Sequence, residues 1–474
     1  MKMQEIREAA EYYREDIIDS LQKLISHKST EGESEAGKPF GKHVDACLKE
    51  ALKIGDMFGL KTKNIDGYAG TIEIGRGKEM LGILCHLDVV PAGDDWSYPP
   101  FEGVVEDGKL YGRGTLDNKG PAVGVIYALK IVKELDINLN RRVRLILGTN
   151  EESGFAGINY YINNEELPEI AFSPDAVFPV IHAEKGILIF DLKTDLSGTK
   201  KENDSGKLKL ISLEGGNAPN MVPDRCKAKI EGDYKYLRQK VDGYNESHDG
   251  ELELNRGDNY FHLVYHGVSA HGSKPQDGKN AVSHLINFLV DLELEDNSLS
   301  SFCDSYQELI GLDYFGKNIG CDMEDEVSGK LVFNVGKIKA DNSKAEVKVN
   351  IRYPVKKDAG LVYSSIEKEI AKHNWSLKKD MHKEPLFVEK NDPLVSSLME
   401  VYHKATGEEC EPIAIGGGTY ARAVPKGVAF GPLFPGEPEL AHQKDEYIKI
   451  DDLIENVIIY AGAIIALASN DELE

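Results

Sequence analysis

The sequence predicts an α/β protein that carries an inserted α+β domain. Apolar strands alternate with amphipathic helices early in the chain, and the composition shifts near residue 185 and again near residue 382. The length of 474 residues also exceeds that of one ordinary domain. We therefore expect residues 1–184 to begin one domain, residues 185–382 to form the insertion, and residues 383–474 to complete the first domain.

Local patterns place the elements along the chain. Helical periodicity predicts helices over residues 4–27, 40–58, 121–134, 392–405 and 451–468. Apolar runs predict strands over residues 71–74, 81–87 and 142–149. The insertion shows β-branched alternation between polar loops, which is typical of an α+β domain.

Charge and cysteine content exclude several classes of partner. Lys and Arg total 56 against 80 Asp and Glu, so the net charge is -24, which repels nucleic acid and anionic membranes. The six cysteines have no paired spacing, which favours reduced thiols over disulfides. No stretch approaches the length of a membrane span, and the N-terminus has no apolar signal region. We expect a cytoplasmic protein that binds neither nucleic acid nor membrane.

A histidine and an aspartate end the strand at 81–87. Residues two apart on a strand share a face, so His86 and Asp88 point the same way. A carboxylate beside an imidazole can orient the ring, as metal sites require. A histidine with satisfied hydrogen bonds at a strand end explains this pair equally well.

Asp117 lies in a glycine-rich loop just before the helix at 121–134. The glycines let the backbone approach a ligand closely. A phosphate loop is a poor interpretation because the Walker spacing is absent. An aspartate that caps the helix remains the other interpretation of this residue.

Two adjacent glutamates, Glu151 and Glu152, follow the strand at 142–149. Neighbouring side chains diverge there, so one can bind a metal while the other handles a proton. A solvated acidic turn is the competing interpretation of the pair by itself.

Two imidazoles and three carboxylates together make a candidate metal site, mostly at the ends of predicted strands: His86, Asp117, Glu152, Asp175 and His442. Carboxylates can bridge two cations, and imidazoles suit zinc. Open α/β sheets hold their sites at the carboxyl ends of strands.

Five motifs occur in a fixed order: His-x-Asp, Gly-Arg-Gly-x-x-Asp, Glu-Glu-x-Gly, Ser-Pro-Asp and a late His. This order resembles the di-zinc exopeptidases of the aminoacylase/carboxypeptidase clan. The length, the insertion and Ser269-Ala270-His271-Gly272-Ser273 are most similar to the peptidase V (carnosinase-like, Xaa-His type) dipeptidase branch. The resemblance implies a zinc-exopeptidase-like catalytic domain with a central mixed sheet flanked by helices, and an inserted α+β lid domain.

The resemblance also implies a role for each motif residue. His86 and Asp175 would hold one Zn²⁺, Glu152 and His442 the other, and Asp117 would bridge them, with Asp88 orienting His86 and Glu151 as general base. Co²⁺ and Mn²⁺ share these ligand types and are possible in place of zinc.

In the insertion, the resemblance implies residues that contact substrate. His271 would donate to the oxyanion, and Arg352 has the fork geometry for a free C-terminal carboxylate. Asn217 would contact substrate, and Gly417 and Gly418 would line the pocket through backbone groups. Taken singly, these features also fit a surface histidine in a turn, a surface salt bridge and a flexible glycine loop.

The predicted function is a zinc-dependent dipeptidase that hydrolyses short unblocked peptides. The resemblance implies a monomer, because in that branch the enlarged lid fills the place of a second subunit. One alternative is an N-acyl-amino-acid amidohydrolase (deacylase or desuccinylase) of the same clan. An alternative from another class is a non-catalytic metal-binding scaffold. A two-metal phosphodiesterase is disfavoured by the net charge of -24.

Overall fold

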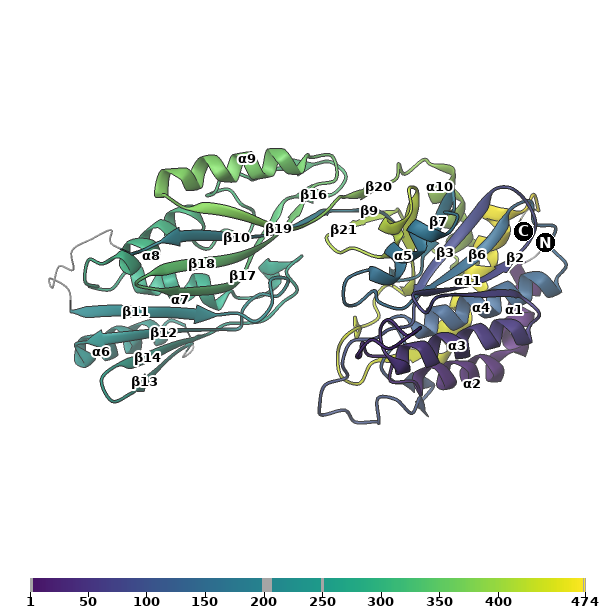
Figure 1. The fold of residues 1–474 in the computed structure, drawn as a ribbon, viewed down its shortest axis with the longest axis horizontal. Coiled ribbons are helices and arrows are strands. Elements are labelled where there is room, and N and C mark those ends of the chain that lie inside the picture. Colours follow the sequence, from purple (N-terminus) through teal and green to yellow (C-terminus); the bar gives the residue numbers. More distant parts are fainter. Residues whose placement is uncertain (1–2, 198–206, 249–250, 472, 474) are drawn as a thin grey trace. The chain divides into compact units, whose positions relative to one another are not determined.

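The computed structural model of the protein describes residues 3–197, 207–248, 251–471 and 473 (Figure 1). The chain forms two compact units. Unit 1 comprises Met1–Ala183, Leu386–Ala414 and Gly418–Glu474, and unit 2 comprises Glu184–Pro385 and Ile415–Gly417.

The short segment Ile415–Gly417 belongs to unit 2, although it lies within residues 383–474, which are predicted to complete the first domain. Two hydrogen bonds explain the difference. The backbone N–H of Lys185 donates to the carbonyl of Ile415 at 3.0 Å, and Arg352 Nη1 donates to the carbonyl of Gly416 at 3.0 Å. The loop is therefore attached to the insertion by contacts that leave no signal in the local sequence.

A mixed sheet forms the centre of unit 1, in the order β1-β2-β6-β3-β7-β22-β9-β20, with β21 beside β9. The neighbours β6, β3, β7 and β22 run parallel, while β2 pairs antiparallel with both β1 and β6, and β9 pairs antiparallel with β22. The central mixed sheet predicted from the resemblance is confirmed. Its strands are β1 (Lys61–Ile65), β2 (Ala69–Ile74), β3 (Met80–His86), β6 (Arg142–Gly148), β7 (Ile170–Ser173), β9 (Val180–Glu184), β20 (Leu386–Phe387), β21 (Ile413–Ile415) and β22 (Gly427–Phe430).

Two small sheets complete the strands of unit 1. One has the order β24-β5-β4 and the other pairs β23 with β8. Their strands are β4 (Val104–Glu106), β5 (Lys109–Tyr111), β8 (Ala176–Val177), β23 (Pro432–Leu433) and β24 (Tyr447–Lys449).

Strand β3 is buried on both faces. Leu81, Ile83 and Cys85 pack into the larger hydrophobic cluster of unit 1, whereas Leu84 packs into a smaller one. Successive side chains of a strand point to opposite faces, so the two clusters lie on the two sides of the sheet. A continuous apolar run is the pattern expected for such a parallel strand.

Helices cover both faces of the sheet. Figure 1 shows α4 and α11 next to each other within unit 1, and α11 also contacts α1 and α10. Helix α5 contributes Ile158 and Tyr161 to the smaller cluster. The helices of unit 1 are α1 (Met3–Tyr12), α2 (Arg14–Ile25), α3 (Lys42–Met57), α4 (Lys119–Glu134), α5 (Ala156–Asn164), α10 (Pro393–Thr406) and α11 (Ile450–Ala468).

The single helix predicted over residues 4–27 is wrong, because the chain breaks at Tyr13 into α1 and α2. Tyr13 has φ -92° and ψ 7°, which lies in the sparsely allowed bridge region. Tertiary contacts hold it there: its hydroxyl donates to Glu134 at 2.8 Å, and Lys130 Nζ lies 3.2 Å from the centre of its ring. The apolar periodicity continues through this break, which is why the sequence suggests one helix.

From Val457 onward helix α11 is apolar on all sides, and neighbouring helices and the sheet pack against it. Within the part of the chain that the structure describes, neither α11 nor any other helix combines the length and apolarity needed to cross a membrane.

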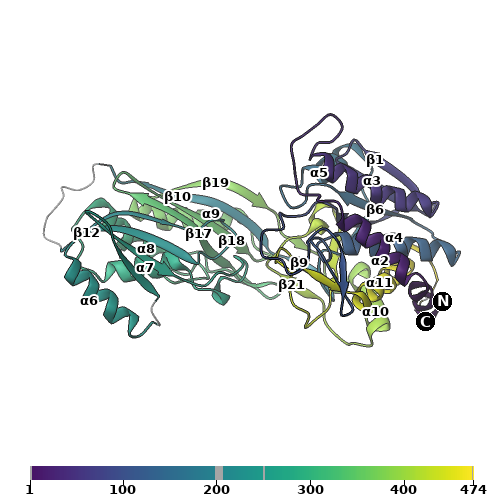
Figure 2. The same cartoon turned by 90° about the horizontal axis from the view of Figure 1, so that it is seen from below.

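Unit 2 is built on one antiparallel sheet in the order β13-β14-β12-β11-β17-β18-β10-β19. Burial alternates along β12, as expected when only one face of a strand is covered. Helices α6 to α9 pack into one hydrophobic cluster with this sheet, and Figure 2 shows α7 and α8 together beside its strands. Unit 2 therefore has the α+β architecture predicted for the insertion.

The strands of unit 2 are β10 (Gly186–Asp195), β11 (Leu208–Gly215), β12 (Arg225–Gly232), β13 (Leu252–Arg256), β14 (Phe261–His266), β15 (Glu324–Asp325), β16 (Gly329–Lys330), β17 (Val332–Asp341), β18 (Lys344–Tyr353) and β19 (Ser376–Lys383). Its helices are α6 (Tyr234–Asn245), α7 (Ala281–Val290), α8 (Ser298–Leu309) and α9 (Ala359–Ile370).

Candidate metal centre

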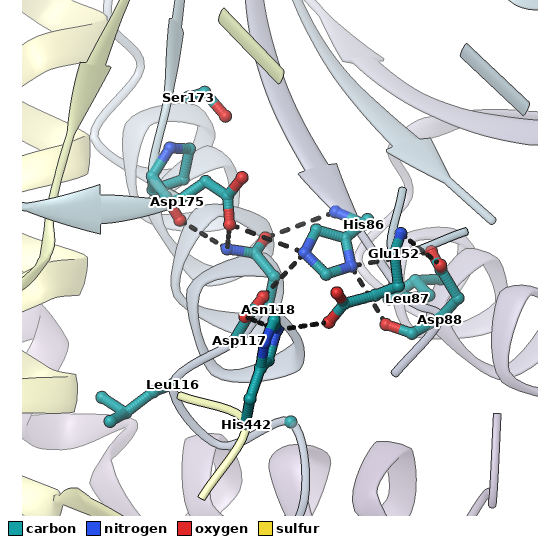
Figure 3. A network of polar contacts seen from close by, with 12 residues as sticks. His86, Leu87, Asp88, Leu116, Asp117, Asn118, Glu152, Ser173, Asp175 and His442 are labelled. Carbon is teal, nitrogen blue, oxygen red and sulfur yellow. Dashed lines mark hydrogen bonds and ion pairs between the residues drawn. The ribbon is translucent and has the colours of Figure 1, made fainter. Parts of the chain in front are cut away.

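Three adjacent parallel strands of unit 1 bring predicted ligands to one edge of the sheet. His86 ends β3, Glu151 and Glu152 follow β6, and Asp175 follows β7. These strands are neighbours in the order β6-β3-β7, so their carboxyl ends meet, as in other open α/β sheets. Figure 3 shows the His86, Glu152 and Asp175 side chains turned toward a common centre.

Asp117 lies between two imidazoles. Its Oδ1 atom is 2.8 Å from Nε2 of His86, and its Oδ2 atom is 3.0 Å from Nε2 of His442 (Figure 3). The residue at the N-cap of α4 is Asn118, not Asp117. The helix-capping interpretation of Asp117 is therefore wrong, and its carboxylate is turned toward the ligand cluster.

His442 comes from the loop between β23 and β24, late in the chain. Its Nε2 atom is 3.1 Å from Oε1 of Glu152, which lies 290 residues earlier. The backbone of His442 has φ +64°. Residues other than glycine rarely adopt this conformation, and such residues are concentrated at functional sites.

The remaining distances describe a compact cluster. Asp175 Oδ1 is 3.5 Å from His86 Nε2. One ligand atom from each of His86, Asp117 and Glu152 lies within 4.8 Å of the others. The five predicted ligands are thus together, although they come from the end of β3 and from four separate loops.

Asp88 contacts His86 through two groups. Its backbone carbonyl is 3.0 Å from His86 Nδ1, and its carboxylate Oδ1 is 3.6 Å from the same nitrogen. Because a carbonyl only accepts hydrogen bonds, Nδ1 of His86 must carry a proton. The other ring nitrogen, Nε2, faces Asp117. The Asp88 Oδ2 atom also accepts the backbone N–H of Glu152 at 3.0 Å. Of these two groups of Asp88, the carbonyl is the nearer to Nδ1, and the carboxylate ties the loop after β3 to the loop after β6.

Both imidazoles of the cluster have a raised pKa. Burial lowers the pKa of His86, but hydrogen bonds to Asp117, Asp175 and Asp88 outweigh burial and hold this pKa well above its usual value. Hydrogen bonds to Asp117 and Glu152 raise the pKa of His442 to about 10. In both cases the neighbouring carboxylates favour the positively charged form of the imidazole.

Burial raises the pKa of the two glutamates, whereas it lowers that of a histidine. It raises the pKa of Glu151 well above its usual value, and the nearby carboxylates of Asp175 and Glu152 add to the effect. Burial and the Asp117 carboxylate also raise the pKa of Glu152. The carboxylates of Asp117, Glu151, Glu152 and Asp175 therefore repel one another at this site. Imidazole and carboxylate are ligands that zinc and related cations use, so the residues fit divalent metal ions.

Arg352, predicted to bind a carboxylate, is in unit 2 on β18 and is only 5% exposed. Its Nε atom donates to Asn350 Oδ1 at 3.0 Å, and its Nη1 atom donates to the Gly416 carbonyl at 3.0 Å. A surface salt bridge does not describe this buried side chain. The contact with Gly416 brings the glycine loop to Arg352.

His271 lies in an exposed turn of unit 2. Its Nδ1 atom is 2.6 Å from Ser273 Oγ. A Cβ atom added to Gly416 would lie 2.9 Å from Ser273 Cβ, so the turn and the glycine loop touch. Asn217 is exposed, after the end of β11. Within unit 2, His271 and the Arg352 side chain therefore border the same loop.

Gly417 and Gly418 differ in how much space a side chain would have at each position. A Cβ atom at Gly417 would meet Ile415 at 3.4 Å, an ordinary contact, while one at Gly418 would lie 2.8 Å from Arg422 Nε. The two residues fall in different units, Gly417 in unit 2 and Gly418 in unit 1.

Comparison with known proteins identifies the family. Residues 82–466 match the model of "Peptidase family M20/M25/M40". The chain is 40% identical over 466 residues to "Putative dipeptidase YtjP" of Bacillus subtilis (strain 168), covering 96% of this chain and 98% of that protein. The chain belongs to the M20/M25/M40 peptidase family. The predicted resemblance to di-zinc exopeptidases is confirmed at this level, and the protein is a metallopeptidase-family hydrolase.

Solved structures share the fold of this M20 peptidase. Human carnosine dipeptidase 1 matches with a TM-score of 0.60 and 14% identity, over 98% of each chain. The aminoacylhistidine dipeptidase from Vibrio alginolyticus matches with a TM-score of 0.59 and 14% identity, over 96% of each chain. At these identities the likeness supports the fold alone.

One residue at the centre of this M20 peptidase is missing from the sequence prediction. Asn118 is fully buried, and its Nδ2 atom donates to the Pro174 carbonyl at 2.6 Å and to Asp175 Oδ1 at 3.2 Å. Its Oδ1 atom accepts the backbone N–H of His86 at 3.3 Å. Its position directly after Asp117 is the only signal in the sequence, since all three hydrogen bonds are made with residues distant in the chain.

Proposed function

We propose that the protein is a zinc-dependent dipeptidase that hydrolyses the peptide bond of short unblocked peptides. The observation that carries the proposal is the position of Asp117 between the imidazoles of His86 and His442. Membership of a peptidase family and 40% identity to a protein named as a dipeptidase support the substrate class.

Five side chains would hold two metal ions. In this proposal His86 and Asp175 hold one, Glu152 and His442 hold the other, and Asp117 bridges the two. Zinc suits the mixture of imidazole and carboxylate, and Co²⁺ or Mn²⁺ can use the same ligands. When bound, the cations would polarise the scissile carbonyl and lower the pKa of the attacking water toward ~7.

Glu151 would be the general base. Its carboxylate takes a proton from the attacking water and returns it to the amine that leaves when the C–N bond breaks. Burial raises the pKa of Glu151, and a carboxylate with a raised pKa is a stronger base toward the proton of the attacking water. Asp88 would hold His86 in orientation through its carbonyl and carboxylate.

The roles proposed for unit 2 rest on the family resemblance. His271 would donate to the oxyanion, Arg352 would bind the free C-terminal carboxylate, and Asn217 would contact the substrate. Gly417 and Gly418 would contribute backbone groups. The proposal also includes a cytoplasmic monomer, and light scattering of the purified protein measures the oligomeric state directly.

The decisive experiment is a substrate panel assayed with and without chelator and added zinc. Ala- and His-containing dipeptides, tripeptides and N-acetyl amino acids are compared. We expect chelator-sensitive cleavage of dipeptides that Glu151→Ala abolishes while metal content is retained. Cleavage of N-acetyl amino acids alone would move the function to the amidohydrolase alternative. A fully metallated protein that cleaves none of these compounds would contradict the proposal and favour the non-catalytic scaffold.

A further inference from the structure

A buried glutamate outside the predicted ligand set holds the loop that carries Asp117. Glu446 is 0% exposed. Its Oε1 atom accepts the backbone N–H groups of Gly114 at 3.1 Å, Leu116 at 2.9 Å and Asp117 at 3.2 Å. A single side chain thus satisfies three amides of one short loop, 329 residues away from Asp117 in the sequence.

The same carboxylate has a cationic partner. Arg113 is 1% exposed, and its Nη1 atom donates to Glu446 Oε2 at 2.6 Å. The guanidinium carbon of Arg113 lies 5.1 Å from the ring centre of Trp96, a cation–π arrangement. A buried carboxylate requires such a charge partner and several donors, and Glu446 has both. The backbone carbonyl of Glu446 also accepts the N–H of Gly112 at 2.9 Å.

Glu446 is linked to two predicted ligands of the candidate metal centre, Asp117 and His442. Glu446 holds the amide of Asp117, whose carboxylate lies between His86 and His442. His442 itself is only a few residues before Glu446 on the same loop. One carboxylate therefore joins the loop of the central carboxylate to the loop of the late histidine.

We propose that Glu446 is a positioning residue of the metal centre, which sets the place of the Asp117 carboxylate relative to His442 through the backbone of residues 112–117. This inference rests on the proposed function, because it gives Asp117 and His442 their role as ligands. Partners that orient metal ligands typically change metal affinity or activity 10–100-fold when they are altered.

Glu446→Gln is the most informative substitution. It keeps the size of the side chain but replaces one acceptor oxygen with an NH₂ group, which would face either the backbone amides or Arg113, all of them donors. Glu73→Gln is the matched control. Glu73 is also a buried glutamate of unit 1, with Arg144 Nε at 2.6 Å and Lys61 Nζ at 3.0 Å, but it belongs to β2, and its partners are not among the predicted ligands.

The two variants and the unsubstituted protein are compared by three measurements. These are the affinity for Zn²⁺ in competition with a chelator, the visible absorption spectrum of the Co²⁺-loaded protein, and thermal unfolding. We expect Glu446→Gln to weaken Zn²⁺ binding by roughly 10- to 100-fold and to change the Co²⁺ spectrum. We expect Glu73→Gln to lower the melting temperature and to leave both metal measurements unchanged.

Each outcome decides between a positioning and a structural role. A folded Glu446→Gln protein with unchanged Zn²⁺ affinity and Co²⁺ spectrum would overturn the inference, whether or not its melting temperature falls. If Glu446→Gln does not fold, Glu446→Asp is measured in the same way. Asp keeps the charge but is too short to reach all three amides, so an unchanged spectrum there would also overturn the inference. Metal binding is measured without substrate, so a protein that binds metal as expected but cleaves no dipeptide contradicts only the proposed function.

Discussion

Nε2 of His442 lies 3.0 Å from Oδ2 of Asp117, joining a loop near the end of the chain to the loop before α4. Hydrogen bonds to Asp117 and Glu152 raise the pKa of His442 to about 10, because the two carboxylates stabilise the positively charged imidazole. A histidine must lose its proton to bind a metal ion, so we expect metal binding at His442 to release protons.

Asp117→Asn tests the bridging role. The amide keeps the shape of the side chain but removes the charge that two cations would share. We expect the affinity for Zn²⁺ to fall by more than about 100-fold, beyond the effect of partners that only orient ligands, with dipeptide hydrolysis lost. Isothermal titration and metal analysis after dialysis measure this. Asp94→Asn, at an exposed aspartate of the same unit, should bind zinc normally, and an Asp117→Asn protein that does so too would exclude the bridging role.

Arg352→Lys tests recognition of the substrate carboxylate. Lysine keeps the charge but loses the planar fork that matches a carboxylate with two hydrogen bonds. We expect the preference for a dipeptide over its C-terminal amide, measured as a ratio of kcat/KM, to fall roughly 10- to 100-fold. Arg256→Lys, at an exposed arginine of unit 2, is the control and should keep the ratio. An unchanged ratio in Arg352→Lys would assign the carboxylate to another group.

Ile83→Ala tests the core of β3. Ile83 is 0% exposed between the sheet and the helices of the larger cluster. We expect the free energy of unfolding to fall by about 2–5 kcal/mol, and by about 0.5–1.5 kcal/mol for Ile83→Val. Met57, which is 62% exposed on α3, should tolerate alanine within about 0.5 kcal/mol. Chemical denaturation followed by circular dichroism measures all three, and equal losses for Ile83→Ala and Met57→Ala would contradict this packing.

His284, on α7, is a titratable side chain of unit 2, whereas the predicted ligands belong to unit 1. Burial, followed by the nearby charge of Lys279, lowers the pKa of His284 to about 4, below its ordinary value of 6.5. The unfolded chain therefore binds more protons between these values, so the contribution of His284 to stability is present above pH 6.5 and is lost as the pH falls through about 4.

His284→Phe isolates that contribution, because phenylalanine can keep the stack on Tyr265, where the ring centres lie 5.4 Å apart. We expect the unsubstituted protein to lose stability relative to the variant as the pH falls from 6.5 toward 4, measured by denaturation at each pH. A difference between the two proteins that stays constant over this range would show that His284 does not titrate as expected.

Much of the fold follows from local patterns. The apolar runs that predict strands at 81–87 and 142–149 correspond to β3 and β6, and the closing helix predicted at 451–468 corresponds to α11. The break at Tyr13 could not be predicted, because it depends on Glu134 and Lys130, which lie far along the chain. The same reason hides Asn118 and Glu446, whose side chains are chemically ordinary and become informative only through their distant partners.

The sequence by itself determined the periodicity of the main elements, the composition of the insertion and the ordered motifs that place the chain in its family. These are local properties, since side-chain period and residue type do not depend on what the chain meets elsewhere. Only the tertiary structure decided that Asp117 faces two imidazoles instead of capping α4, and that the Asp88 carbonyl is the nearest partner of His86 Nδ1. These contacts depend on the pairing of β6, β3 and β7 and on loops that are hundreds of residues apart in the sequence. The physical reason is that hydrogen bonds form between atoms that are close in space, whatever their separation in sequence.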